Sequence, residues 1–141
     1  MREIIFRGKR KDNGEWVQGF VFGDDLIGSN KMFIGAIIIE NGEIVGTSIS
    51  EVVPESIGQY TGLTDKNGKK IFEGDIVNVN TNKDALYHIY EGRHLVIRFD
   101  EYHRFVASGS LEYPLCNRYE WEVIGNIHDN KEILKGEITD A

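Results

Sequence analysis

At 141 residues, with 40% hydrophobic and 28% charged residues, the chain has the composition of a folded globular protein and not of a disordered one. Its net charge of −7 opposes binding to a polyanion, because lysine and arginine supply most of the non-specific affinity for nucleic acid. The longest apolar run, residues 36–39, is far shorter than the roughly 18 residues of a spanning helix, which excludes membrane insertion.

The first 22 residues predict a β-hairpin. Two apolar segments, residues 4–6 and 16–22, flank Asn13-Gly14, a pair that suits the positive φ angles of a tight turn. A run of basic side chains at residues 7–11 lies beside this turn. We expect that run to be the solvated end of a hairpin rather than a nucleic-acid site.

A second hairpin is predicted around Asn41-Gly42, which separates the apolar residues 32–39 from a partner strand that starts at residue 43. Pro54 cannot donate to a strand ladder and marks a boundary. We therefore expect a mainly β protein with an N-terminal β-rich unit at residues 1–57 and a second unit at residues 58–141. The two could also form one continuous domain.

The second unit contains several short segments that favour strands, among which residues 95–99 alternate apolar and polar side chains with the period of a half-buried strand. The segments are residues 59–63, 71–72, 75–79, 95–99, 105–107 and 121–124. Gly125 interrupts the last of them as a β-bulge would. A single helical turn is expected at residues 130–134. We expect burial of the apolar strand residues Phe6, Trp16, Phe20, Ile76, Ile97, Phe99 and Trp121.

Two stretches, residues 59–77 (QYTGLTDKNGKKIFEGDIV) and residues 121–130 (WEVIGNIHDN), resemble the hallmark segments of YopX-like proteins, as does the opening at residues 1–7. The resemblance implies a phage or prophage accessory protein whose C-terminal part is similar to an SH3-like small β-barrel, a fold used mainly for binding. It implies no reaction and no catalytic residue. Residues 21–57 match no part of the family pattern, so a function specific to this chain could lie there.

The family-like segments contain residues that suit turns: Gly62, Asn67, Gly68, Gly74 and Asp75. A phosphate-binding loop is disfavoured because no Gly-Lys-Ser or Gly-Lys-Thr and no helix follow. Asp75 beside glycine could be a catalytic acid, but an aspartate that accepts backbone hydrogen bonds at a strand entry explains the pair better. We expect all three glycines to act through backbone geometry and to have positive φ.

Thiol and metal chemistry are both disfavoured. Cys116 is the single cysteine, so it can form no intramolecular disulfide, and no nucleophile motif surrounds it that would pair it with His103 or His128. The four histidines show no metal-binding spacing. We predict no cofactor and no metal. One cysteine and the lack of a secretion-signal pattern favour the cytoplasm.

The sharpest hint of a binding surface is a stretch in which aromatic and basic side chains alternate. Its candidate residues are Tyr90, Arg93, Arg98, Tyr102, His103 and Arg104. Such a pattern resembles a base-stacking platform on a small barrel. Glu91, Asp100 and Glu101 offset the arginines, however, so a protein interface is favoured over a nucleic-acid groove.

The leading hypothesis is a non-enzymatic module that binds an unidentified protein partner through a β-rich surface. One alternative is a nucleic-acid-associated small barrel that uses the stretch from Arg93 to Phe105. The other is an enzyme with an unfamiliar site near Asp75 or His103. The oligomeric state does not follow from the sequence.

Overall fold

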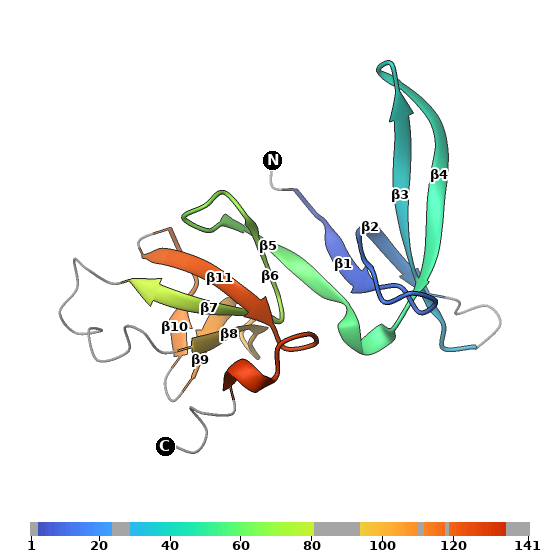
Figure 1. Ribbon diagram of the computed structural model, residues 1–141. Helices are drawn as coiled ribbons and strands as arrows, with labels where there is room; N and C mark the ends of the chain where they lie inside the picture. Colours follow the sequence, from blue (N-terminus) through green and yellow to red (C-terminus); the bar gives the residue numbers. More distant parts are fainter. Residues whose placement is uncertain (1–2, 24–28, 81–93, 110–111, 118, 135–141) are drawn as a thin grey trace. The chain divides into compact units, whose positions relative to one another are not determined.

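The computed structural model describes residues 3–23, 29–80, 94–109, 112–117 and 119–134. Within these ranges the chain is mainly β, as predicted (Figure 1). The strands are β1 (Phe6–Lys9), β2 (Trp16–Gly23), β3 (Met32–Glu40), β4 (Glu43–Val52), β5 (Gly58–Thr64), β6 (Lys70–Phe72), β7 (Asp75–Asn80), β8 (His94–Phe99), β9 (Phe105–Ser108), β10 (Glu112–Pro114) and β11 (Glu120–Asn126). A 3₁₀ turn at Pro54–Ser56 and one helical turn at residues 132–134 complete the described structure.

The chain forms two compact units, Met1–Tyr60 and Thr61–Ala141. The predicted division followed residue 57, at the start of β5. The observed division lies inside that strand, because the first residues of β5 pair with β1 while its end pairs with β6.

The first unit is an antiparallel meander in the order β4-β3-β2-β1, followed by the start of β5. The end of β1 and the end of β4 lie side by side, where Arg10 forms a β-bridge with Val52. The Lys11 N–H donates to the Glu51 carbonyl at 3.0 Å, and the Val53 N–H donates to the Lys9 carbonyl at 2.9 Å. This closure buries a small core of Ile34 and Val52 against Gly8, where an added Cβ would lie 3.0 Å from the Ile34 side chain.

In the second unit the strand order is β10-β9-β8-β7-β11, and each of these neighbouring pairs is antiparallel. The expected SH3-like barrel is therefore not closed within the described strands, since β10 and β11 form the two edges of this sheet. A physical reason lies in β10, which has three residues and ends at Pro114, a residue that has no N–H to extend a ladder.

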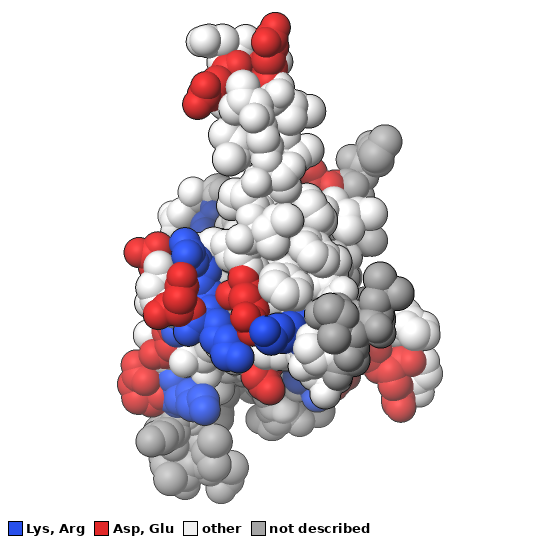
Figure 2. All heavy atoms as spheres, turned by 90° about the vertical axis from the view of Figure 1, so that its right-hand side faces the viewer, with Lys and Arg blue, Asp and Glu red and all other residues white. Residues whose placement is uncertain are grey.

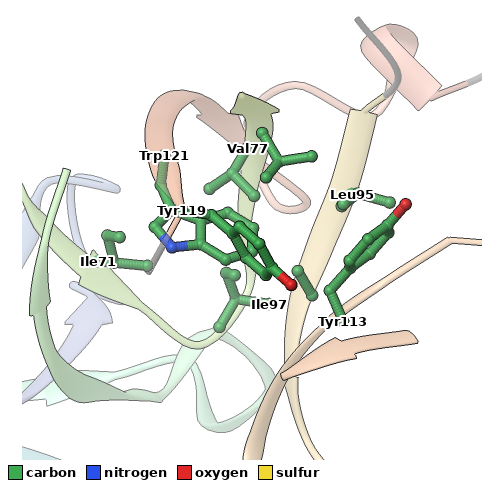
Figure 3. Packing of buried hydrophobic residues seen from close by; sticks show 9 residues of the cluster. Ile71, Val77, Leu95, Ile97, Tyr113, Tyr119 and Trp121 are labelled. Atoms are coloured by element: carbon green, nitrogen blue, oxygen red, sulfur yellow. The ribbon is translucent and has the colours of Figure 1, made fainter. Parts of the chain in front are cut away.

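The core of the second unit lies on one face of this sheet (Figure 3). Tyr119 packs edge-on against Trp121 at 5.9 Å between ring centroids and against Tyr113 at 6.4 Å. Such perpendicular ring contacts are favourable beyond their buried area. The rings cover aliphatic residues from three strands, namely Ile71, Val77, Val79, Leu95 and Ile97.

The burial expected from strand alternation is confirmed for Ile76, Ile97 and Trp121. Phe6 and Trp16 are half-buried. The expectation is wrong for Phe20, 48% exposed, and Phe99, 45% exposed. Phe20 points to the outer face of the coiled first sheet, opposite Ile34 and Val52. Phe99 is the last residue of β8, where its ring lies 4.9 Å from that of Phe105 and 5.9 Å from that of His103, beside an exposed turn and away from the core.

The position of the core predicts how truncations affect stability. Ile97→Ala should lower the free energy of unfolding by about 2–5 kcal/mol, because it leaves a cavity in a packed interior. Ile4→Ala, at a side chain that is 69% exposed, should change it by less than about 0.5 kcal/mol. Urea unfolding of both variants measures the difference, and equal losses would contradict this core assignment.

Candidate functional site

The stretch predicted as an interaction surface is partly described. Tyr90 and Arg93 lie outside the described residues. The other four surround the turn between β8 and β9: Arg98 on β8, and Tyr102, His103 and Arg104 in the turn. Tyr102 is 70% exposed, and the Arg104 guanidinium lies 5.4 Å from its ring centroid.

Asp100 organises this turn. Its carboxylate accepts hydrogen bonds from the backbone N–H groups of Tyr102 and Arg104, at 3.0 and 2.9 Å, and from the Arg104 guanidinium at 2.8 and 3.0 Å. Partial burial acts to raise the pKa of Asp100, but these hydrogen bonds outweigh it and the pKa lies below its usual value. His103 completes the turn with φ of 62°.

Both described arginines of this stretch are engaged by acids. Arg104 binds Asp100, and Arg98 on β8 donates to Glu112 on β10 at 2.6 Å. A groove for phosphate needs cationic groups that can neutralise the ligand. This local pairing reduces the support for a nucleic-acid site here and is compatible with a mixed-charge protein surface.

Asp65 is the centre of the first family-like segment. Its carboxylate accepts from the backbone N–H groups of Asn67 and Lys69 in its own loop, and from that of Val123 on β11, each at 2.9 Å. Burial acts to raise the pKa of Asp65, but the three N–H donors and the nearby Lys69 charge outweigh it, so the pKa is lowered. The residue is buried and structural, and it joins a loop to a strand 58 residues further along the chain.

The three glycines of the signature have the positive φ angles that were predicted for them. Gly62, Gly68 and Gly74 have φ of 92°, 80° and 91°. Asp75 is 1% exposed, and its carboxylate accepts from the Phe72 N–H at 2.7 Å. This is the strand-entry role that the sequence favoured over a catalytic acid.

The second family-like segment also makes a turn. The Asn126 side-chain oxygen accepts from the backbone N–H groups of His128 and Asp129, both at 2.9 Å. Asn130 packs on Gly125, where a Cβ would lie 2.6 Å from the Asn130 amide oxygen. The register of β11 shifts between Val123 and Gly125, which confirms the predicted bulge.

Groups that could perform thiol or metal chemistry are dispersed. Cys116 is half-buried against the core, and its carbonyl accepts from the Trp121 indole at 2.7 Å. His88 lies outside the described residues. Among the described residues, no three histidine, cysteine or acidic side chains are grouped as metal ligands would be. In that same part of the chain, no helix is both long and apolar enough to cross a membrane.

The most unusual surface lies in the first unit, where the outer half of the β3–β4 hairpin extends beyond the strands beside it (Figure 1). We call residues 37–46 the arm. Ile37, Ile38 and Ile39 are consecutive and all exposed, so apolar side chains project from both faces of the hairpin. Ile44 and Val45 on the returning strand are exposed as well. Exposed apolar clusters of this kind mark interaction sites.

An aromatic strip continues this surface toward the base of the arm. Phe20, Phe22 and Phe33 stack in sequence, with ring centroids 5.7 and 5.4 Å apart. The Phe20 ring covers Gly35, where a Cβ would lie 2.4 Å from it, and Gly19 approaches the Gly35 carbonyl so closely that a Cβ there would overlap it. Ile49, directly across from Gly35 on β4, is 61% exposed.

Charges lie at the two ends of this apolar surface (Figure 2). At the tip, Glu40 and Glu43 face each other across the hairpin. At the base, the Arg7 guanidinium lies 4.6 Å from the centroid of the Trp16 ring, which Lys9 also approaches. Two more basic residues pair there with acids: Arg10 with Asp12 at 2.7 Å and Lys11 with Glu51 at 3.2 Å.

Sequence reasoning placed these residues in strands but did not identify the arm as a surface. A signal was present: three consecutive isoleucines in a strand must put apolar side chains on both faces, and only a two-sided core would cover them. The hairpin residues 32–52 contain no basic side chain.

Comparisons with known proteins agree with these observations. The family model described as YopX protein matches residues 5–135. The crystal structure of protein EF1440 from Enterococcus faecalis is similar with a TM-score of 0.56 and 26% sequence identity, over 96% of this chain and 100% of that one. No curated protein matches the sequence.

The geometry of Asp65 predicts a pH-dependent contribution to stability. Asp65→Asn should lower the free energy of unfolding by about 1–3 kcal/mol at neutral pH, because the buried N–H groups lose a charged acceptor. The pKa is lower in the folded state, so this contribution is complete well above the unfolded value of about 3.9 and is lost as the pH falls through the folded value. Urea unfolding should show a smaller difference in the free energy of unfolding between wild type and Asp65→Asn near pH 3 than at neutral pH. The exposed control Glu101→Gln should show little effect, and a difference independent of pH would contradict the assigned role.

The φ angle of Gly68 predicts a matched pair of outcomes. Gly68→Ala should destabilise the fold by about 1 kcal/mol, because φ is 80° and no atom near the added Cβ could otherwise account for a loss. Gly46→Ala in β4 has similar space but no positive φ, so it should be neutral or slightly stabilising. Thermal unfolding compares the two. Equal effects would contradict the backbone role, and an unchanged stability in Gly68→Ala with loss of a binding partner would make the loop a recognition element.

Proposed function

The chain belongs to the YopX family, and from that premise we propose that it is a non-enzymatic protein-interaction module whose contact surface is the arm and the aromatic strip. We place it among the phage or prophage accessory proteins and in the cytoplasm. The observation that carries the proposal is the exposure of the arm's isoleucines on both faces of one hairpin. The free energy falls when a partner removes solvated apolar side chains from water, so such a surface favours association.

The composition of the surface supports a protein partner. Aromatic and large aliphatic side chains at its centre, with charged residues at its margins, form the usual anatomy of a protein interface. Phe20, Phe22 and Phe33 are already ordered by stacking on one another and on Gly35, so a partner would immobilise few additional rotamers.

The structure gives less support to an enzyme. The buried carboxylates nearest the signature, Asp65 and Asp75, both accept backbone N–H groups and have assigned structural roles. His103 lies in an exposed turn, with its ring 5.9 Å from Phe99. The role proposed for the chain therefore uses its surface shape and not a reactive group.

Recovery of partners tests the proposal. A tagged chain and its Ile37→Thr/Ile39→Thr/Ile44→Thr variant would be compared in nuclease-treated lysate of the native host. Threonine keeps the β-branched shape that suits a strand, so the variant should fold. Wild type should recover a stoichiometric protein and the variant at least about tenfold less, because interface truncations commonly weaken binding by more than 1 kcal/mol each.

The matched control is Ile4→Thr, since Ile4 is 69% exposed and lies outside the arm. It should recover as much partner as wild type. Equal recovery by the arm variant, or recovery that disappears on nuclease treatment, would contradict the proposal.

A further inference from the structure

We infer that the arm docks on a second copy of this chain, with the two arms packed antiparallel about a two-fold axis, an inference that rests on the proposed function. Three observations lead to this partner: the area of the exposed surface, its two-sidedness, and the opposite character of its two ends.

The exposed area matches what a stable dimer needs. Eight large apolar side chains of the arm and strip are between 37% and 68% exposed: Phe20, Phe22, Ile37, Ile38, Ile39, Ile44, Val45 and Ile49. Because a large apolar side chain presents roughly 150–250 Å² when fully exposed, they offer on the order of 800 Å². This is about the area that each partner contributes to a standard protein interface.

The two-sided exposure favours an elongated partner of similar shape. Ile37 and Ile39 share a face with Ile49 and the aromatic strip, and Ile38 lies on the other face. A flat protein surface would cover one face alone. Another hairpin that lies along the first can contact apolar side chains along its whole length. In an isologous dimer, the same patch on each copy covers the patch of the other copy.

The charges select the antiparallel arrangement. Parallel packing would bring Glu40 and Glu43 of both copies together, and close like charges oppose association. Antiparallel packing places each acidic tip beside the base of the other arm. Four basic residues there, Arg7, Lys9, Arg10 and Lys11, outnumber the acids Asp12, Glu15 and Glu51.

The base of the arm also offers space for a tip. A depression of about 370 Å³ lies there and is lined by Arg10, Lys11, Asp12, Ile49, Ser50 and Glu51. The tip is narrow, because Asn41-Gly42 forms the turn and Gly42 has no neighbour within 4 Å of a Cβ position. The depression therefore suits the turn and the first glutamates of the second copy.

Sedimentation velocity of the full chain at micromolar concentrations tests the inference. Wild type and Ile4→Thr should show a concentration-dependent dimer. Ile37→Thr/Ile39→Thr/Ile44→Thr should raise the dimer dissociation constant by at least about tenfold, with an unchanged circular dichroism spectrum that shows the variant to be folded. A monomer at all concentrations, or a dimer unaffected by the folded arm variant, would overturn the inference. Recovery of a different protein through the arm would then still leave the proposed function standing.

Cysteine cross-linking tests the orientation, in a Cys116→Ser background. Glu43→Cys mixed with Lys11→Cys should form a disulfide-linked dimer under mild oxidation, since each tip meets the other base. Neither variant should cross-link with itself, because the two copies of the same cysteine lie at opposite ends of an antiparallel dimer. Rapid cross-linking of Glu43→Cys with itself would overturn the antiparallel arrangement.

Discussion

The second unit depends on one buried carboxylate that must be fully hydrogen-bonded. Asp65 satisfies this requirement with N–H groups from its own loop and from β11, so the loop after β5 and the last strand are fixed by a common acceptor. The Lys66 N–H adds a bond to the Trp121 carbonyl in the same place. Trp121 is thereby held over the core, and the core in turn keeps water away from the carboxylate. Packing and hydrogen bonding support each other here.

The family-like residues and the proposed contact surface have separate roles. Asp65, Asp75 and Asn126 hold turns through backbone hydrogen bonds, and none of them belongs to the arm. The arm lies within residues 21–57, where the sequence alone showed no family-like segment, but the family model spans residues 5–135 and so includes the arm. A signature can therefore identify the scaffold of a protein without locating its contacts. In this chain the two family-like segments, residues 59–77 and 121–130, lie mostly in the second unit, while the exposed isoleucines of the arm project from the first.

Local turn chemistry made much of the fold predictable. Asn13-Gly14 and Asn41-Gly42 mark two hairpins, and both glycines have positive φ. The orientation of strands relative to a core was harder to predict, because it depends on distant contacts. Phe20 alternates as a buried residue would, yet the bridge between Arg10 and Val52 coils the sheet so that Ile34 is inside and Phe20 outside. The ion pair between Asp100 and Arg104 is local, because four residues separate the two. The ion pair between Arg98 and Glu112 depends on the order of the strands, which the local sequence pattern does not reveal.

The glycines beneath the aromatic strip affect how this surface can evolve. Gly19 admits no side chain because a Cβ would overlap the Gly35 carbonyl, and a Cβ at Gly35 would displace the Phe20 ring, so the root of the hairpin is sterically constrained. Farther out, the nearest atom to a Cβ at Gly46 is 4.0 Å away, and in this outer part only the turn residue Gly42, with φ of 80°, is bound to glycine by its backbone conformation. Substitutions can accumulate in the outer hairpin without disturbing the fold that holds it. Related chains could thus diversify their binding preferences by changing a few outer residues on a root that stays constant.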